Sequence, residues 1–184
     1  MRVDIATTKN KYNVIYASPP WIYKGDGVEG IGVTTDEICT LPIADLAAED
    51  SVLFLWASYP LLKDAMEVID EWGFGYKQVA YTWIRPLAEG QDVGCLYRWI
   101  RADVRVCLMA TRGSPKNVHI FLDAPQIICS PMEQHHVVRD MIANSLGDSR
   151  YIELYARDWL WDWDRWGNDA PSNMAELDDV FNRR

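Results

Sequence analysis

The sequence predicts a single α/β domain with a mainly parallel sheet covered by helices on both faces. Three observations predict this class. Short apolar runs rich in β-branched and aromatic residues alternate along the chain with segments of helical periodicity. The runs are apolar at nearly every position, which is typical of strands buried on both faces of a sheet. The 184 residues suffice for one well-buried domain, and they contain neither an internal repeat nor an inter-domain linker.

The first half of the chain contains three expected strands, at residues 14–17, 51–56 and 76–84. Residues 35–39 predict a helical turn, and Pro42 suits the first turn of a second helix. Apolar residues then recur at helical spacing from Leu61 to Trp72, and Gly73 closes that helix.

The glycine-rich stretch 25–32 follows the first strand, and its composition predicts a mobile loop that serves as a candidate lid. It lacks the sharp strand-to-helix turn of a dinucleotide fingerprint.

The second half alternates in the same way. We expect, in order, a strand at 104–110, a turn at 112–115, a short strand at 126–129, a helix from Val137 to Leu146 ended by Gly147, and a last strand at 151–155. The folded domain would end near residue 169. The acidic residues 170–184 are expected to form a loose tail or a marginal helix.

The net charge of -9 and a pI near 4.7 argue against a protein that coats nucleic acid by general electrostatics. The charge is uneven, however. Residues 98–116 carry five bases against one acid, a local charge of +4, whereas residues 158–184 carry seven acids against three bases. A basic patch that binds a few phosphates and an ordinary solvated face are both consistent with this pattern.

Cysteine and histidine spacing predicts no metal site. The four cysteines form no Cys-x-x-Cys pair, and the three histidines complete no zinc pattern, so we expect reduced thiols buried as small apolar residues. No apolar run approaches the roughly 20 residues of a membrane span, and the N-terminus lacks a signal-peptide core. We therefore expect a soluble, cytoplasmic protein.

Ser18, Pro19, Pro20 and Trp21 come directly after the first expected strand. A Pro-Pro step has fixed φ angles and no competing N–H, so it holds the Pro19 carbonyl rigidly. That carbonyl and the Ser18 hydroxyl are both able to accept hydrogen bonds from an amine, and the indole offers a face on which a base can stack. A proline pair is also ordinary punctuation at a strand end, and the tetrapeptide alone leaves both interpretations open.

The tetrapeptide resembles the [Asp/Asn/Ser]-Pro-Pro-[aromatic] signature of enzymes that methylate an exocyclic amine of a nucleobase. Two later segments, Glu-Leu-Tyr-Ala-Arg at 153–157 and Trp-Asp-Arg-Trp-Gly-Asn at 163–168, closely resemble the ending of the MT-A-type adenine methyltransferases. Segments at 53–56, 71–74, 83–85 and 107–113 fall in that family's order, so the resemblance covers nearly the whole chain. The family includes the catalytic subunit of the eukaryotic mRNA adenosine methyltransferase and many bacterial and phage members.

The resemblance implies a Rossmann-like methyltransferase fold that uses S-adenosyl-L-methionine and has a permuted motif order, with the domain at residues 1–169. It implies catalytic roles for Ser18, Pro19, Pro20 and Trp21. It implies cofactor contacts from Asp4, Ile5, Ser18, Gln134, Glu153, Arg157, Asn168 and Asp169, and substrate contacts from Tyr23, Trp99, Arg101 and Arg105. From the residues alone, Glu153 would be a strand-end carboxylate paired with Arg157, and Trp99 would be a core residue.

Three departures from the family pattern concern the substrate. Ser18 stands where the family usually has Asp, Gln134 falls where it has Lys, and Arg105 replaces an acid two residues before Cys107. Serine is a neutral acceptor that also donates, and Ser-Pro-Pro-aromatic is typical of enzymes that methylate the cytosine amine.

We accordingly expect a compact, bacterial or phage-like methyltransferase acting on the exocyclic amine of a flipped base, with N6 of adenine in DNA as the favoured target. N4 of cytosine in DNA, adenine in RNA, and a catalytically inactive binding or partner subunit remain alternatives. The expected partners are nucleic acid, DNA before RNA, and either a second copy of the chain or a partner subunit. The sequence indicates neither the recognition site nor the oligomeric state.

Overall fold

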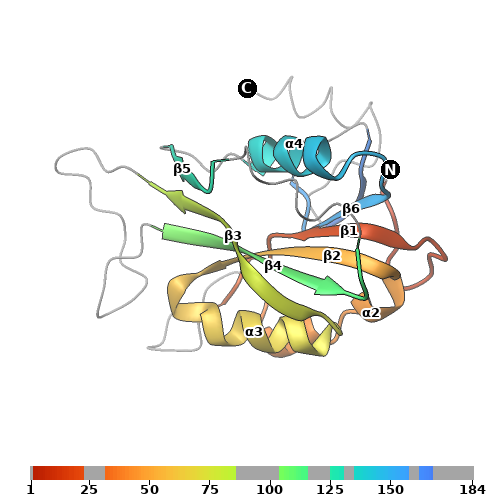
Figure 1. The fold of residues 1–184 in the computed structure, drawn as a ribbon. Helices are drawn as coiled ribbons and strands as arrows, with labels where there is room; N and C mark the ends of the chain where they lie inside the picture. The colour runs from red at the N-terminus through yellow and green to blue at the C-terminus, as the bar shows by residue number, and fades with distance from the viewer. Residues whose placement is uncertain are drawn as a thin grey trace, which may run out of the picture.

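The computed structural model describes residues 2–22, 32–85, 104–115, 125–130, 135–157 and 162–167. Within these ranges the chain forms one seven-stranded sheet in the order β5-β3-β4-β2-β1-β6-β7 (Figure 1). The strands are β1 (Tyr12–Ala17), β2 (Ala47–Ser58), β3 (Gly75–Ile84), β4 (Val104–Arg112), β5 (Ile127–Cys129), β6 (Tyr151–Leu154) and β7 (Asp164–Trp166). The helices are α1 (Thr35–Cys39), α2 (Ile43–Leu46), the 3-10 turn η1 (Tyr59–Leu61), α3 (Leu62–Glu71) and α4 (His135–Leu146).

The sheet is mainly parallel, as the sequence predicts. Strands β7, β6, β1 and β2 run in one direction, and β3 is parallel to β5. Strand β4 runs against both of its neighbours, β2 and β3. The alternation of apolar runs reveals that strands exist but not their directions, so this antiparallel strand was not anticipated.

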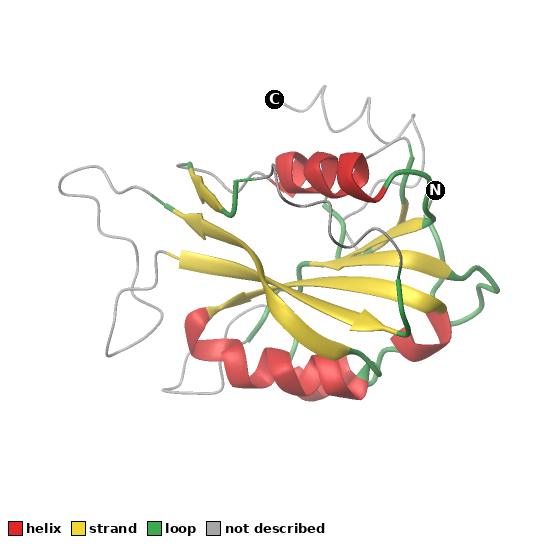
Figure 2. Ribbon diagram, in the orientation of Figure 1, coloured by secondary structure: helices red, strands yellow, loops and turns green. Residues whose placement is uncertain are grey.

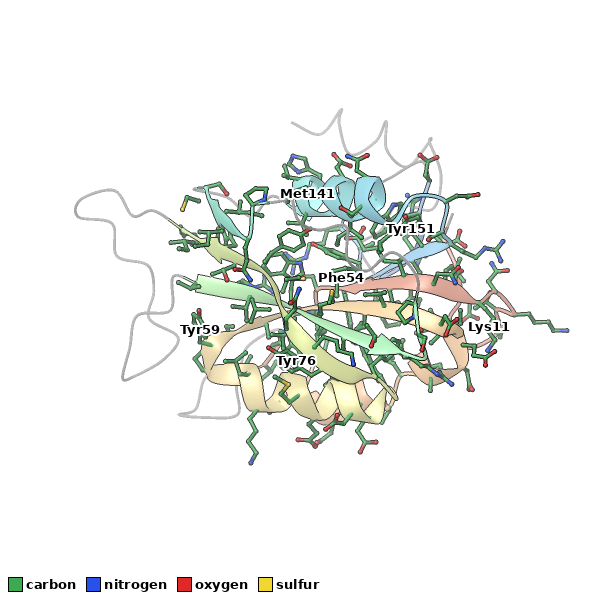
Figure 3. All side chains as sticks on the ribbon, viewed as in Figure 1. Lys11, Phe54, Tyr59, Tyr76, Met141 and Tyr151 are labelled. Atoms are coloured by element: carbon green, nitrogen blue, oxygen red, sulfur yellow. The ribbon has the colours of Figure 1, made fainter. Side chains whose placement is uncertain are left out.

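Helices cover both faces of the sheet, with α2 and α3 on one face and α4 on the other (Figure 2). Side chains of β1 alternate between the two cores because successive residues of a strand point to opposite faces. Ile15 and Ala17 pack with Ile38 of α1 and the apolar stripe of α3, whereas Val14 and Tyr16 pack toward α4. Phe54 of β2 lies between the sheet and α4, where the labelled Met141 also packs (Figure 3).

The helix ends follow the expected chemistry. Thr34 and Glu37 form a capping box at the start of α1. Gly73 and Gly147 have φ angles of 78° and 61° directly after α3 and α4, a conformation that glycine adopts without the strain of a Cβ. Both predicted glycine stops are therefore confirmed.

Several strands differ from their expected bounds: β1, β2 and β4 are longer than predicted, and the end of the last expected strand was placed wrongly. Strand β6 ends at Leu154, Tyr155 turns away with a φ of 61°, and a further strand, β7, follows. A run of three residues, Asp-Arg-Trp, is too short for alternation to reveal a strand, and β7 forms because β6 supplies a parallel partner.

Two members of the expected basic patch are described. Arg105 and Arg112 lie seven residues apart at opposite ends of β4, about 23 Å along the strand. They therefore do not share a patch. Arg98, Arg101 and Lys116 lie outside the described residues, as do the stretch 25–31 and the acidic tail. None of the described helices is both long enough and apolar enough to cross a bilayer.

The first strand sits in the middle of the sheet, between β2 and β6. The connection from β1 to β2 carries α1 and α2 over one face, whereas α4 leads into β6 over the other. Adjacent parallel strands whose connections leave on opposite faces form a topological switch point. Open α/β sheets bind their ligands at the carboxyl ends of the strands at such a point. Here this is where the paired strands β1 and β6 end.

Candidate active site

The tetrapeptide Ser18-Pro19-Pro20-Trp21 begins where β1 ends, at the switch point. We call this side of the sheet the carboxyl edge: β1, β2, β3, β5, β6 and β7 end here, and β4 begins here. Ser18 is buried, with 6% of its surface exposed, and its N–H donates to the Leu154 carbonyl of β6 over 3.4 Å. The backbone of the tetrapeptide is thus joined to the neighbouring strand while the hydroxyl faces the edge.

The turn of the tetrapeptide is held on two sides. Trp21 N–H donates to the Pro19 carbonyl (3.0 Å), and the Pro20 carbonyl accepts from Val33 N–H (2.8 Å). The indole Nε1 of Trp21 donates to the Trp56 carbonyl of β2 (2.8 Å). The Pro19 carbonyl therefore already accepts one hydrogen bond and keeps its second lone pair for another donor.

Gly32 packs closely against the Pro20 carbonyl of the tetrapeptide. A Cβ at position 32 would stand 2.3 Å from the Pro20 carbonyl oxygen and 2.8 Å from the Ile22 side chain. Only glycine allows residues 32 and 33 to approach the Pro-Pro step so closely. The sequence showed a glycine-rich stretch but did not distinguish this glycine from its neighbours.

Arg105, predicted to contact substrate, reaches the tetrapeptide directly. It lies at the start of β4, where its Nη2 donates to Ser18 Oγ over 3.5 Å. Its guanidinium carbon lies 5.9 Å from the centroid of the Trp56 ring. Two of the three departures recognised in the sequence, 87 residues apart, are thus in contact.

The side chain of Glu153 is buried rather than exposed at the end of its strand. Its carboxylate forms a buried ion pair with Arg139 of α4, with 2.5 Å between Nη1 and Oε2. Arg157, the partner considered from sequence, is exposed instead. Arg139 was missed, although its place beside Val138 and three residues before Ile142 puts it on the apolar stripe of α4.

The ion pair belongs to a buried polar layer behind the carboxyl edge. Glu153 is level with Tyr16 of β1 and Arg165 of β7 in the sheet register. The Tyr16 hydroxyl accepts from Trp56 Nε1 over 2.6 Å. Burial raises the pKa of the Tyr16 phenol well above its usual value, and Cys107 and Glu153 raise it further. Tyr16 therefore stays neutral and serves as a fixed polar support for Trp56.

The two C-terminal motif segments pack together at the same edge. Tyr155 contacts Trp166 edge to face at 5.2 Å, and Ala156 N–H donates to the Trp166 carbonyl over 3.1 Å. A Cβ on Gly167 would meet the Ala156 nitrogen at 2.9 Å, so the close approach requires glycine. The exposed Arg157 projects from the end of this turn.

Asp4 and Ile5 reach this edge from the N-terminus. Residues 2–3 run parallel to β7, with Val3 N–H donating to the Arg165 carbonyl over 2.8 Å, so the next residues are level with the end of that strand. The exposed Asp4 carboxylate accepts from Ala6 N–H and from the Thr7 hydroxyl, both at 3.0 Å, whereas Ile5 is buried in the core.

The structure thus brings Ser18, Pro19, Pro20, Trp21, Arg105 and Arg157 to one edge, with Glu153 buried behind them. The predicted residues Tyr23, Trp99, Arg101, Gln134, Asn168 and Asp169 lie outside the described part of the chain. Trp56 was not anticipated as a site residue. Its carbonyl holds Trp21 while its ring lies against Arg105.

Three known proteins resemble the chain along most of its length. It is 26% identical over 197 aligned residues to the type II methyltransferase M.MunI of a Mycoplasma species, covering 92% of this chain and 82% of the relative. It is 26% identical to the N6-methyladenosine RNA methyltransferase MTA1 of Pyricularia oryzae, covering 86% and 47%. It is 25% identical to the N(6)-adenosine-methyltransferase MT-A70-like protein of Drosophila melanogaster, covering 82% and 25%. The chain therefore spans about half of the second relative and a quarter of the third.

A family comparison matches the part of the chain that contains these segments. Residues 12–169 match MT-A70, a span that begins with β1 and reaches past Gly167 to the residues that follow β7. This span contains the tetrapeptide, Arg105, the β6 turn and Asn168. The chain belongs to the MT-A70 family of adenine methyltransferases.

Proposed function

We propose that the chain transfers a methyl group to the exocyclic amine of a nucleobase, with N6 of adenine in DNA as its substrate. The observation that carries this proposal is the placement of the tetrapeptide. Two amine acceptors and an indole are held together at the switch point, beside the strand that leads into the second family motif. An extruded base needs a stacking face and acceptors for its amine at one place, and this arrangement supplies both.

The cofactor proposed for the family, S-adenosyl-L-methionine, fits the residues at the neighbouring ends of β6 and β7. The exposed Asp4 carboxylate suits ribose hydroxyls and the exposed Arg157 suits a carboxylate, and that molecule has both groups. Asn168, Asp169 and Gln134 are further proposed contacts on the family resemblance. Glu153 is proposed to support this site without a direct contact to the cofactor, because its buried carboxylate is paired with Arg139. When bound, the cofactor supplies a methyl group already activated by a sulfonium sulfur.

In the proposed mechanism the residues of the tetrapeptide hold and orient the base. Trp21 stacks against the ring, and Ser18 Oγ and the Pro19 carbonyl accept from the amine, so that its nitrogen presents its lone pair to the methyl carbon. With the cofactor bound beside this base, the amine nitrogen would take its methyl group as the carbon–sulfur bond breaks, and the amine proton would pass to water. Alignment supplies most of the acceleration because the leaving group needs no assistance from a strong base.

The buried thiol nearest the site takes no part in this chemistry. Burial raises the pKa of Cys107 well above its usual value, although Arg105 lowers it somewhat. The thiol therefore stays protonated and is a poor nucleophile. This argues against a covalent adduct at Cys107 and is consistent with direct transfer to an amine.

DNA is favoured over RNA by the extent of the similarity. The chain covers 82% of the type II methyltransferase but 47% of the RNA methyltransferase from Pyricularia oryzae. Adenine in RNA is the second candidate, because two relatives carry adenosine methylation in their names. Methylation of N4 of cytosine remains a further alternative, because a serine at position 18 is typical of enzymes that methylate the cytosine amine.

The decisive experiment is methylation of single- and double-stranded DNA and RNA oligonucleotides, followed by digestion and identification of the modified base. We expect N6-methyladenine in DNA. N4-methylcytosine would correct the base, and product confined to RNA would correct the polymer. A folded chain that neither methylates any substrate nor binds the cofactor by calorimetry would instead be a binding or partner subunit.

A further inference from the structure

We propose that Arg105 is a positioning residue of the amine-binding site, which holds the Ser18 hydroxyl and makes the site dependent on serine at position 18. The inference rests on the proposed function and deepens it. Its basis is the contact of 3.5 Å between Arg105 Nη2 and Ser18 Oγ, in a site where Ser18 is buried.

Arg105 is held in place by the sheet on both sides. It pairs with Ser58 of β2 and with Trp83 of β3 in the antiparallel register, and its guanidinium lies over Trp56. Trp56 is 2% exposed, and its indole nitrogen is bonded to the Tyr16 hydroxyl. The guanidinium therefore approaches Ser18 from a fixed direction, set by a tryptophan that also fixes Trp21.

A serine hydroxyl has two acceptor positions and one donor. Donation from Arg105 uses one acceptor position and restricts rotation of the hydroxyl, so the other acceptor position faces the incoming amine. Contacts that are long before a ligand binds commonly tighten in the reactive complex. Arg105 thus fixes the direction of the Ser18 hydroxyl, just as the rigid Pro-Pro step fixes the direction of the Pro19 carbonyl.

A carboxylate at position 18 would behave differently beside the same arginine. An Asp oxygen within reach of Arg105 would form a charge-assisted pair, with its lone pairs directed at the guanidinium. The carboxylate would then be drawn toward the cation and away from the amine, and its remaining lone pairs would be weaker acceptors. The structure therefore predicts that Ser18→Asp is harmful because Arg105 is present, and that removing Arg105 relieves the harm.

A double-mutant cycle in kcat tests this, with the amine-methylating activity measured at saturating cofactor and oligonucleotide. We expect Arg105→Met to lower kcat about tenfold and to leave the KM for the cofactor unchanged, with Arg105→Lys restoring part of the loss. Ser18→Asp should lower kcat at least about tenfold in the wild-type background. In the Arg105→Met background the same change should alter kcat by less than about threefold.

Arg85 provides the matched control. It is an exposed arginine at the same edge, 5.1 Å over the Trp83 ring. The effects of Arg85→Met and Ser18→Asp should multiply without coupling, which separates a local contact from a general change of charge.

Urea unfolding of the same variants reports on the contact without any catalysis. Ser18→Asp should lower the unfolding midpoint more when Arg105 is absent, because the buried carboxylate then loses its cation. Active wild type with no coupling in kcat would overturn the role of Arg105 and leave the proposed function standing. Wild type that methylates none of the oligonucleotides would overturn the proposed function, and this inference with it.

Discussion

The proposed chemical role of Ser18 belongs to its side chain and not to its backbone. Its N–H holds β6 through Leu154, whereas its hydroxyl faces Arg105 and the carboxyl edge. Removal of the hydroxyl therefore leaves the strand pairing intact.

We predict that Ser18→Ala lowers kcat about 10- to 100-fold, much more than it weakens binding of the cofactor. Steady-state kinetics and calorimetry measure the two quantities. Ser51→Ala is the control, since that serine is fully buried in the same fold, donates to the Ala48 carbonyl and lies about 17 Å along β2 from Trp56, the residue level with the site. Unchanged turnover in Ser18→Ala would remove Ser18 from the mechanism.

The pair of Arg139 and Glu153 also acts at the residue scale, but on stability. Arg139→Met leaves a carboxylate inside the protein without this cation, and we expect the free energy of unfolding to fall by about 3–5 kcal/mol. Replacing both residues by methionine should cost less than the single change, because no buried charge of the pair remains. Urea unfolding of the two variants measures the difference, and equal losses would contradict the argument.

At the scale of elements, glycines explain why some features were predictable and others were not. Gly73 and Gly147 follow clear helical periodicity, so their role as stops could be read from the sequence. Gly32 and Gly167 are needed because another segment approaches them, and nothing in their own neighbours reveals that segment. For the same reason the partner of Glu153 was missed, since the sequence cannot say which face of β6 meets α4.

The close contact of Gly32 and Val33 with the Pro-Pro step gives the element-scale prediction. Gly32→Ala should lower kcat about tenfold or more while the protein stays folded, because its Cβ displaces the Pro20 carbonyl and with it the Trp21 ring. Gly75→Ala is the control. Its nearest neighbour, the Thr111 carbonyl oxygen, lies at an ordinary 3.8 Å. Circular dichroism checks the fold, and equal kcat values for the two variants would argue against the turn as a support of the site.

For the whole molecule, buried tyrosines make stability depend on alkaline pH. Burial raises the pKa of Tyr12 to about 12, and it also raises those of Tyr16, Tyr81 and Tyr155. The unfolded value is about 10. The folded state thus holds these protons more tightly, so their stabilising contribution is complete below pH 10 and is lost as the pH rises through the folded values.

We therefore predict that the urea midpoint falls between pH 10 and 12. Tyr12→Phe, which removes the hydroxyl bonded to Asp164, should make that fall shallower. The measurement is a series of urea titrations at fixed pH. A midpoint that stays constant up to pH 12 would contradict the burial of these phenols.

The order of strands in the whole molecule could not be derived from periodicity. Apolar runs predict buried strands, but pairing depends on contacts between residues such as Ile15 and Ile152, far apart in the chain. In the sheet the first strand lies inside, between β2 and β6, and the last strand, β7, lies beyond β6 at one edge.

The place of β1 beside β6 has a consequence for synthesis of the protein. The ribosome makes the tetrapeptide long before the strand beside it, since β1 pairs with β6 and Ser18 is bonded to Leu154. A nascent chain that has not yet released residues 151–154 contains the whole tetrapeptide but lacks the strand that holds Ser18. The topology thus ties the proposed activity to a chain that has been made past β6, and a shorter fragment carries the tetrapeptide without its support.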